Sequence, residues 1–301
     1  MPLTDSTATS PPRRRCFPLM ATLMVFLWTP AVGLGGEPEV RITHSGSWTI
    51  AESENFRLVA QNSRIPLREV AEQCETLKTT LQKKWLGQSS NRPWLPVCEI
   101  TFCSTLRDYH RALGSGVGTS VGCATINYDQ GRVTQRQIHI RLDHEDWLTD
   151  ALPHELTHVI VADRFTENRI PPWLDEGIGV LSESDEKQQE RFKALQASLR
   201  RGHKYSWEDL FRVRSFPPAN YRNAFYGQSA RLVDYLSRQG KSPSHLLEFA
   251  QHAEEHGYQA AYQKYYASEE SANLSAPLEN HLPHNVILGM SQERDQSSLV
   301  D

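Results

Sequence analysis

The sequence predicts an α+β fold in which a mixed α/β half at residues 37–145 is followed by a mainly helical half at residues 146–267. In the first half, short segments alternate apolar and polar residues, which is the period of a half-buried β-strand. Beyond Gly177 the apolar residues recur at helical spacing instead. A hydrophobic content of 39% with 23% charged residues is ordinary for a soluble globular chain, so the composition allows a substantial core.

The elements of the first half follow from these patterns. Residues 48–60 alternate like one extended strand or a hairpin. After Pro66, apolar residues recur at helical spacing through Leu86 while Glu and Lys fill the opposite face, which predicts a surface helix packed on a sheet. The other expected elements of this half are a strand at 97–102, a short helix at 105–113, a glycine-rich loop at 114–118 and strands at 121–126 and 136–142.

In the second half we expect helices at 191–199, 226–236 and 258–266, with a loop rich in Arg and Pro at 211–219. From Ser268 onward the chain is polar and has few apolar residues. Residues 268–301 are therefore expected to form a flexible tail.

The first 36 residues have the layout of a signal peptide. Three arginines at 13–15 precede an apolar run at 16–32, which predicts export to the periplasm or the extracellular space. A membrane anchor is the alternative, but the run is shorter than the roughly 20 residues that a spanning helix needs. Pro18 and Pro30 also interrupt it. Cleavage is thus the preferred interpretation.

Cysteine usage and net charge narrow the chemistry further. Four cysteines follow the apolar run, and an even number is compatible with disulfides in an exported protein, although free buried thiols remain the alternative. These are Cys74, Cys98, Cys103 and Cys123. A formal net charge of -4 without a long basic stripe argues against nucleic acid as a partner. The oligomeric state stays open.

The most informative motif is HELTH at residues 154–158. Residues four apart lie on one face of a helix, so His154 and His158 can share one tetrahedral Zn²⁺, while Glu155 can accept a proton from a water molecule beside the metal. The apolar residues 159–161 that follow are typical of a buried metal-binding helix.

A third ligand is available in the segment PPWLDEG at residues 171–177, where Glu176 comes eighteen positions after His158. A catalytic zinc ion typically has three protein ligands, and two histidines with one glutamate are a common set. Asp175 or Glu183 can hydrogen-bond the ligand imidazoles, and the sequence does not choose between them.

Pro153, directly before the first histidine, bears on the geometry of this helix. Proline is tolerated in the first turn, because the N–H groups there have no partner within the helix. We therefore expect the helix to begin after Thr149 or Asp150 as N-cap. A start near Trp147 would kink it at the proline.

Together these segments resemble the gluzincin metallopeptidases, in particular bacterial peptidase-MA-like domains, in which HExxH precedes a W-L-x-E-G segment. Residues 224–229, AFYGQS, resemble the Y-x-Q-S helix of those domains, and residues 53–58, SENFRL, resemble their opening strand. The likeness spans roughly residues 47–266, and only the two zinc segments are specific. Proline before the first histidine departs from the pattern.

The resemblance implies a zincin-like fold with one zinc ion per chain, bound by His154, His158 and Glu176, and with Glu155 as general base. It also implies an oxyanion donor from the helical half. Tyr226 is our candidate for that donor and Tyr221 its nearest rival.

The family resemblance further implies that residues 136–142 form an edge strand along the cleft, to which a polypeptide substrate can add. The expected function is zinc-dependent peptide hydrolysis. A catalytically inactive binding module and a zinc hydrolase of a small non-peptide substrate are the alternatives.

Overall fold

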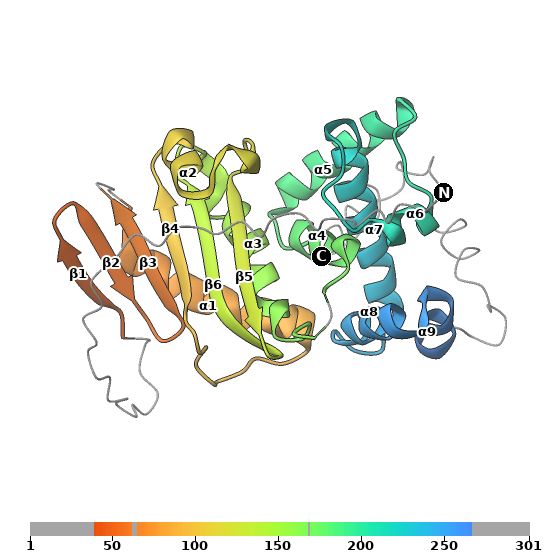
Figure 1. Cartoon of the computed structure of the whole chain (residues 1–301), viewed down its shortest axis with the longest axis horizontal. Helices are drawn as coiled ribbons and strands as arrows, with labels where there is room; N and C mark the ends of the chain where they lie inside the picture. The colour runs from red at the N-terminus through yellow and green to blue at the C-terminus, as the bar shows by residue number, and fades with distance from the viewer. Residues whose placement is uncertain (1–38, 62–64, 168, 267–301) are drawn as a thin grey trace, which may run out of the picture. The chain divides into compact units, whose positions relative to one another are not determined.

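A six-stranded mixed sheet forms the first half of the computed structural model, which describes residues 39–61, 65–167 and 169–266 (Figure 1). The strand order is β1-β2-β3-β4-β6-β5; β3 and β6 run parallel to β4, and the other neighbours are antiparallel. Their bounds are β1 Arg41–Ser45, β2 Trp48–Glu52, β3 Phe56–Gln61, β4 Cys98–Cys103, β5 Gly122–Asp129 and β6 Arg132–Arg141. The segment expected as one strand or a hairpin is a hairpin, and β1 extends it by a strand that the sequence analysis missed.

The expectation that residues 136–142 form a sheet edge is wrong. Residues 136–141 belong to β6, which ends at Arg141 and pairs with β4 on one side and with β5 on the other. The turn after β5 has positive φ at Gln130 and Gly131, so the chain folds back and β5 covers the outer side of β6. The edge strand on this side of the sheet is therefore β5, and β1 forms the opposite edge.

Two helices, α1 (Leu67–Leu86) and α3 (Ala151–Ala162), pack on one face of this sheet and against each other (Figure 1). The apolar spacing correctly predicts α1, whose buried side is the apolar stripe, and α1 ends at Gly87 in a left-handed conformation. The short helix α2 (Leu106–Leu113) begins where Thr105 accepts a hydrogen bond from the N–H of Asp108.

The second half of the described chain is helical, as expected. Its helices are α4 Pro172–Val180, α5 Asp185–Arg200, α6 Trp207–Arg212, α7 Arg222–Gln239, α8 His245–His256 and α9 Tyr258–Tyr265. Short 3₁₀ turns occur at Ser115–Val117, Glu145–Trp147 and Ala219–Tyr221. The sequence analysis missed α6 and α8. The start of α6 lies outside the expected loop at 211–219, but its end overlaps that loop.

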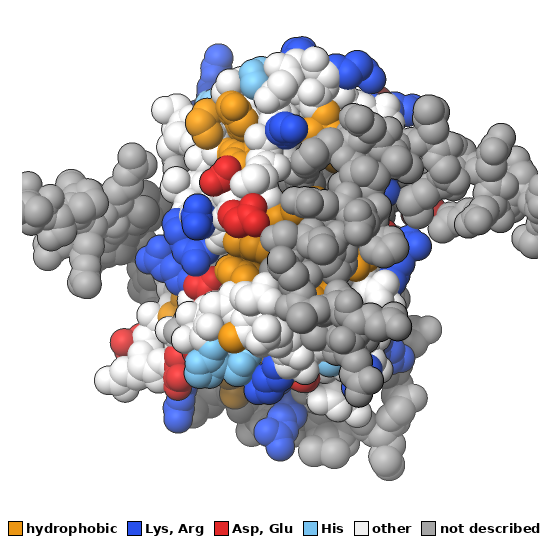
Figure 2. Space-filling view, turned by 90° about the vertical axis from the view of Figure 1, so that its right-hand side faces the viewer, with side chains coloured by type: hydrophobic (Ala, Val, Ile, Leu, Met, Phe, Trp, Pro, Cys, Tyr) orange, Lys and Arg blue, Asp and Glu red, His pale blue; other side chains and the backbone are white. Residues whose placement is uncertain are grey.

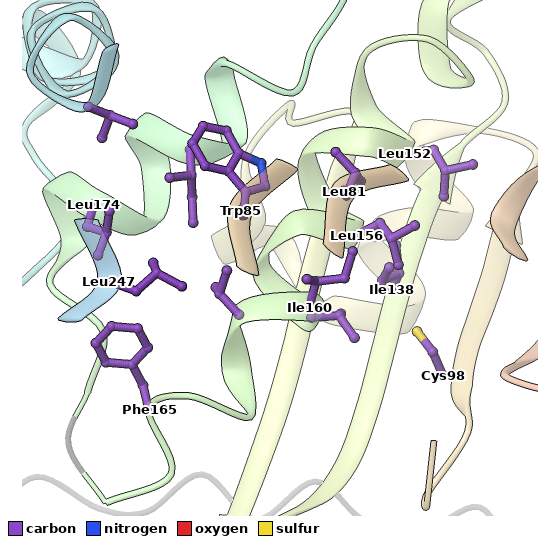
Figure 3. Packing of buried hydrophobic residues seen from close by; sticks show 14 of the residues in the cluster. Leu81, Trp85, Cys98, Ile138, Leu152, Leu156, Ile160, Phe165, Leu174 and Leu247 are labelled. Carbon is purple, nitrogen blue, oxygen red and sulfur yellow. The ribbon is translucent and has the colours of Figure 1, made fainter. Parts of the chain in front are cut away.

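One hydrophobic cluster joins the sheet, the helices behind it and the helical half (Figure 3). Side chains come from α1, α3, α4, α8, β4 and β6; the figure labels Leu81, Trp85, Leu152, Leu156, Ile160, Ile138, Cys98, Leu174 and Leu247 among them. Each fully buried aliphatic side chain stabilises the fold by roughly 1.5–3 kcal/mol. Because both halves share this cluster, the elements that carry the expected metal ligands rest on a common support.

The thiols of Cys74, Cys98, Cys103 and Cys123 are free, which is the alternative to disulfides. Burial raises the pKa of the Cys103 thiol to about 11, so this side chain behaves as an apolar core residue. The expected signal segment 1–36 and tail 268–301 lie outside the described residues. Within the described ranges, no helix is both long and apolar enough to span a bilayer.

The side of the molecule on which the helical half lies carries charges of both signs (Figure 2). On the described part of this face, Lys and Arg side chains lie among Asp, Glu, His and apolar side chains. On the described part of this face, positive and negative charges therefore offset one another, so a charged ligand would be bound there by individual side chains and not by a large patch of one sign.

Candidate metal centre

The helix α3 begins late enough to accommodate Pro153. Its N-cap is Asp150, so Pro153 is the third helical residue, where a missing N–H breaks no helical hydrogen bond. The N–H of His154 donates to the carbonyl of Asp150 at 3.2 Å. The rings of His154 and His158 lie one turn apart with centroids separated by 4.9 Å. The expected late start is confirmed, and the two imidazoles share one face.

The helix α4 brings Glu176 to these histidines. Pro171 and Pro172 open α4, which suits them because proline fixes the backbone of a first turn without needing a hydrogen bond there. One ligand atom from each of His154, His158 and Glu176 lies within 4.8 Å of the others. The structure thus brings together the three residues that the sequence predicts as ligands.

Each histidine has its own carboxylate partner at Nδ1. His154 Nδ1 lies 2.9 Å from Oε1 of Glu183, and His158 Nδ1 lies 2.6 Å from Oδ1 of Asp175. A carboxylate at Nδ1 accepts a hydrogen from the ring and directs Nε2 of that ring toward the centre. Asp175 and Glu183, between which the sequence did not choose, therefore each hydrogen-bond one of the two histidines.

Glu183 is itself held by Arg191, a residue that the sequence analysis missed. The Arg191 Nε donates to one carboxylate oxygen at 3.0 Å and its Nη2 to the other at 2.7 Å. The α4–α5 loop that carries Glu183 is also tied to α1, since Lys84 donates to the Leu181 carbonyl and Trp85 Nε1 donates to Ser182 Oγ at 3.0 Å. The contacts to α1 join segments that are far apart in the chain, so no local sequence signal predicts them.

The side chain of Glu155 extends from α3 to the edge strand β5. It is buried, with an exposed fraction of 9%. A Cβ at Gly122 of β5 would lie 2.6 Å from Cγ of Glu155, so only glycine lets the edge strand approach this closely. Burial raises the pKa of the Glu155 carboxyl, although the two histidines oppose the shift. A raised carboxyl pKa suits a general base working near neutral pH.

Tyr226 of α7 lies near enough to the Glu176 and Glu155 carboxylates to interact with their charges. Burial and then the negative charge of Glu176 raise the pKa of its phenol. The Arg191 guanidinium lies over the phenol ring, 5.1 Å from the centroid. The rival Tyr221 contacts His203 and Tyr205, with ring centroids 5.1 Å and 5.4 Å away. Of the two candidates, Tyr226 thus interacts with the charges of Glu176 and Glu155, whereas the contacts of Tyr221 are with His203 and Tyr205.

The pKa values of the two histidines bear on the charge of the ion that this centre can bind. Burial lowers the pKa of His154, but its bonds to Glu176 and Glu183 outweigh burial and raise the pKa to about 10. Burial likewise lowers the pKa of His158, and the charge of Asp175 outweighs it and raises the pKa to about 9. Both rings therefore hold an extra proton at neutral pH when no metal is bound.

A divalent cation carries the same charge as the two protons that it would displace. The donor set, two imidazole nitrogens and one carboxylate, is typical of zinc. Space for the centre also depends on a glycine, because a Cβ at Gly179 would lie 2.8 Å from Nε2 of His154. The residues present thus fit a zinc ion.

A scan against protein-family models found no match for this chain, and a search of curated proteins found none either.

Proposed function

We propose that this protein is an exported zinc-dependent metallopeptidase of the gluzincin type, which hydrolyses peptide bonds with Glu155 as general base. The observation that carries the proposal is the convergence of His154, His158 and Glu176, with Glu155 on the same helix directed at the sheet edge. The signal-like first 36 residues support the export part of the proposal.

Zinc bound by the two histidines and Glu176 supplies a Lewis acid that lowers the pKa of water and polarises a carbonyl. Glu155 accepts the proton of the attacking water and passes it to the leaving amine. The hydroxyl of Tyr226 donates a hydrogen bond to the oxyanion that develops on the scissile carbonyl. Asp175 and Glu183 hold the imidazoles in the orientation that this chemistry requires.

The edge strand β5 supports a polypeptide as substrate. An edge strand has unpaired backbone groups on its outer side, to which an extended peptide can add by main-chain hydrogen bonds. Gly122 begins β5 and lies against Glu155. A peptide paired with this strand would run past the general base.

The test is zinc content and cleavage by the purified full chain, for the wild type and the Glu155→Gln and Glu176→Ala variants. We expect about one zinc ion per wild-type chain with cleavage of casein, retained zinc without cleavage in Glu155→Gln, and loss of zinc in Glu176→Ala. A wild type without zinc overturns the proposal. Zinc without casein cleavage favours the binding module, or the non-peptide hydrolase if small esters are cleaved.

A further inference from the structure

A second arginine lies one helical turn from Tyr226. Arg222 is the first residue of α7 and precedes Tyr226 by four positions, so the two side chains are neighbours on one helix face. Arg222 is exposed at the surface. Its positive charge, like that of Arg191, opposes the rise in the pKa of Tyr226. The guanidinium of Arg222 is thus within electrostatic reach of the proposed oxyanion donor.

The two arginines differ in whether their charge is compensated. The charge of Arg191 is compensated by Glu183, to which it donates two hydrogen bonds. Arg222, in contrast, makes no ion pair with any carboxylate in the described ranges of the chain. An uncompensated arginine beside a proposed catalytic centre is available to an anionic group of a ligand.

Phe216 holds the guanidinium of Arg222 in place. The Arg222 Cζ lies 4.8 Å from the centroid of the Phe216 ring, and the same ring meets Tyr226 edge-on at 6.3 Å. Phe216 nevertheless remains 59% exposed. One aromatic side chain therefore contacts both the arginine and the phenol. Because the ring already restricts the guanidinium, Arg222 loses less conformational entropy on binding a ligand than a freely moving surface arginine would.

We propose that Arg222, supported by Phe216, binds a carboxylate of the peptide substrate close to the scissile bond. This inference rests on the proposed peptidase function and names its substrate class. A helical turn separates neighbouring side chains by about 5–6 Å, and an extended residue spans about 3.3–3.6 Å. The carboxylate therefore belongs within about two residues of the scissile bond, either as an Asp or Glu side chain or as the free carboxyl terminus.

The test uses short acetylated alanine-based peptides in which Glu or Gln occupies each position in turn, each made with a free and an amidated carboxyl terminus. Cleavage by the zinc-loaded full chain is measured as kcat and KM, and the cut bond is located by mass spectrometry. We expect at least one carboxylate form to be cut with about tenfold higher kcat/KM than its amide counterpart. Preference for the free terminus identifies a carboxypeptidase, and preference for internal Glu identifies an acidic side-chain subsite.

Three variants assign this preference to the proposed site. Arg222→Met keeps the long side chain over Phe216 and removes the charge, so the ratio between carboxylate and amide peptides should fall to about one, mainly through KM. Arg222→Lys keeps the charge without the planar fork and should retain part of the ratio. Arg92→Met removes another exposed charge, from the loop before β4, and should leave the ratio unchanged. A ratio that survives in Arg222→Met overturns the inference, as does a wild type without preference.

A binding measurement separates this inference from the proposed function. The same peptides are titrated by calorimetry into zinc-loaded Glu155→Gln protein, which binds without turnover. Tighter binding of the carboxylate form that Arg222→Met abolishes supports the inference even if the wild type cleaves nothing and the peptidase proposal fails. Equal binding of both forms overturns the inference even if the wild type is an active peptidase.

Discussion

At the scale of single residues, the acids at Nδ1 of His154 and His158 should determine how well these histidines bind zinc. Oδ1 of Asp175 lies 2.6 Å from Nδ1 of His158, and a carboxylate at this position makes an imidazole a better metal ligand. We expect Asp175→Asn to weaken zinc affinity about 10–100-fold, because the amide keeps the shape and loses the charge. Competition with a chelator measures the affinity. Asp129→Asn, at the exposed end of β5, is the control, and equal affinity in both variants would contradict the prediction.

The role proposed for Tyr226 differs from that of the metal ligands, so removal of its hydroxyl should leave zinc binding intact. We expect Tyr226→Phe to lower kcat about 10²–10³-fold with little change in KM or zinc content, since the hydroxyl stabilises only the developing oxyanion. Tyr221→Phe is the matched control and should keep the wild-type kcat. A larger loss of kcat in Tyr221→Phe than in Tyr226→Phe would instead indicate Tyr221 as the oxyanion donor.

At the scale of elements, two glycines set how closely neighbouring elements approach the centre. Gly122→Ala places a methyl group against Glu155, so we expect loss of activity with zinc retained. Gly179→Ala places one against Nε2 of His154, so we expect loss of zinc. Gly116→Ala, which meets open space at a glycine with ordinary φ, should change neither. Parallel measurement of zinc content and kcat/KM distinguishes the three. Zinc loss in Gly122→Ala would show that β5 supports the ligands rather than the base.

The grouping of His154, His158 and Glu176 could be predicted from the sequence because these residues come from two short helices with local signals. The spacing in HELTH places His154 and His158 on one face, and the prolines before Trp173 mark the start of the helix that carries Glu176. The order of strands is not local. No pattern within residues 136–142 predicts that β5 pairs beside them, so the sequence analysis assigned the edge of the sheet to the wrong strand.

The helices α6 and α8, which the sequence analysis missed, do have local sequence signals. Ser206, the N-cap of α6, accepts a hydrogen bond from the N–H of Asp209, which is a capping pattern visible in the sequence. In α8 the buried residues Leu246, Leu247, Ala250 and Ala253 recur at helical spacing. Arg191 differs from both, since its bond to Glu183 joins α5 to the preceding loop and follows only from the packed structure.

At the scale of the whole described molecule, metal binding and folding should be linked. Residues of α1 hold the loop of Glu183, and the shared hydrophobic cluster supports both ligand helices. Zinc that binds only the folded chain therefore stabilises all of it, by about 4 kcal/mol at a free zinc concentration a thousandfold above the Kd. A single unfolding transition whose Tm falls on adding a chelator is expected in calorimetry. Two separate transitions, of which zinc moves only one, would contradict this linkage.

The pH dependence of that stabilisation follows from the histidines. In the metal-free protein the pKa values of His154 and His158 are raised from 6.5 to about 10 and about 9. Protonated histidines thus stabilise the metal-free fold; the contribution is complete below pH 6.5 and is lost as the pH rises through 9 and 10. Zinc requires both rings without the extra proton, so its binding at pH 7 should release about two protons, and its affinity should rise with pH up to this range.

Urea unfolding between pH 6.5 and 10 measures this effect. With chelator present, the free energy of unfolding should fall as the pH rises, whereas saturating zinc should remove that fall because the rings are already deprotonated. A His154→Gln, His158→Gln double variant lacks both groups and should lose the same pH dependence without zinc. Parallel curves for the metal-free wild type and the double variant would show that these histidines are not protonated at the centre. In that case the centre would not hold two protons whose charge a divalent cation replaces, and this argument for a metal would fail.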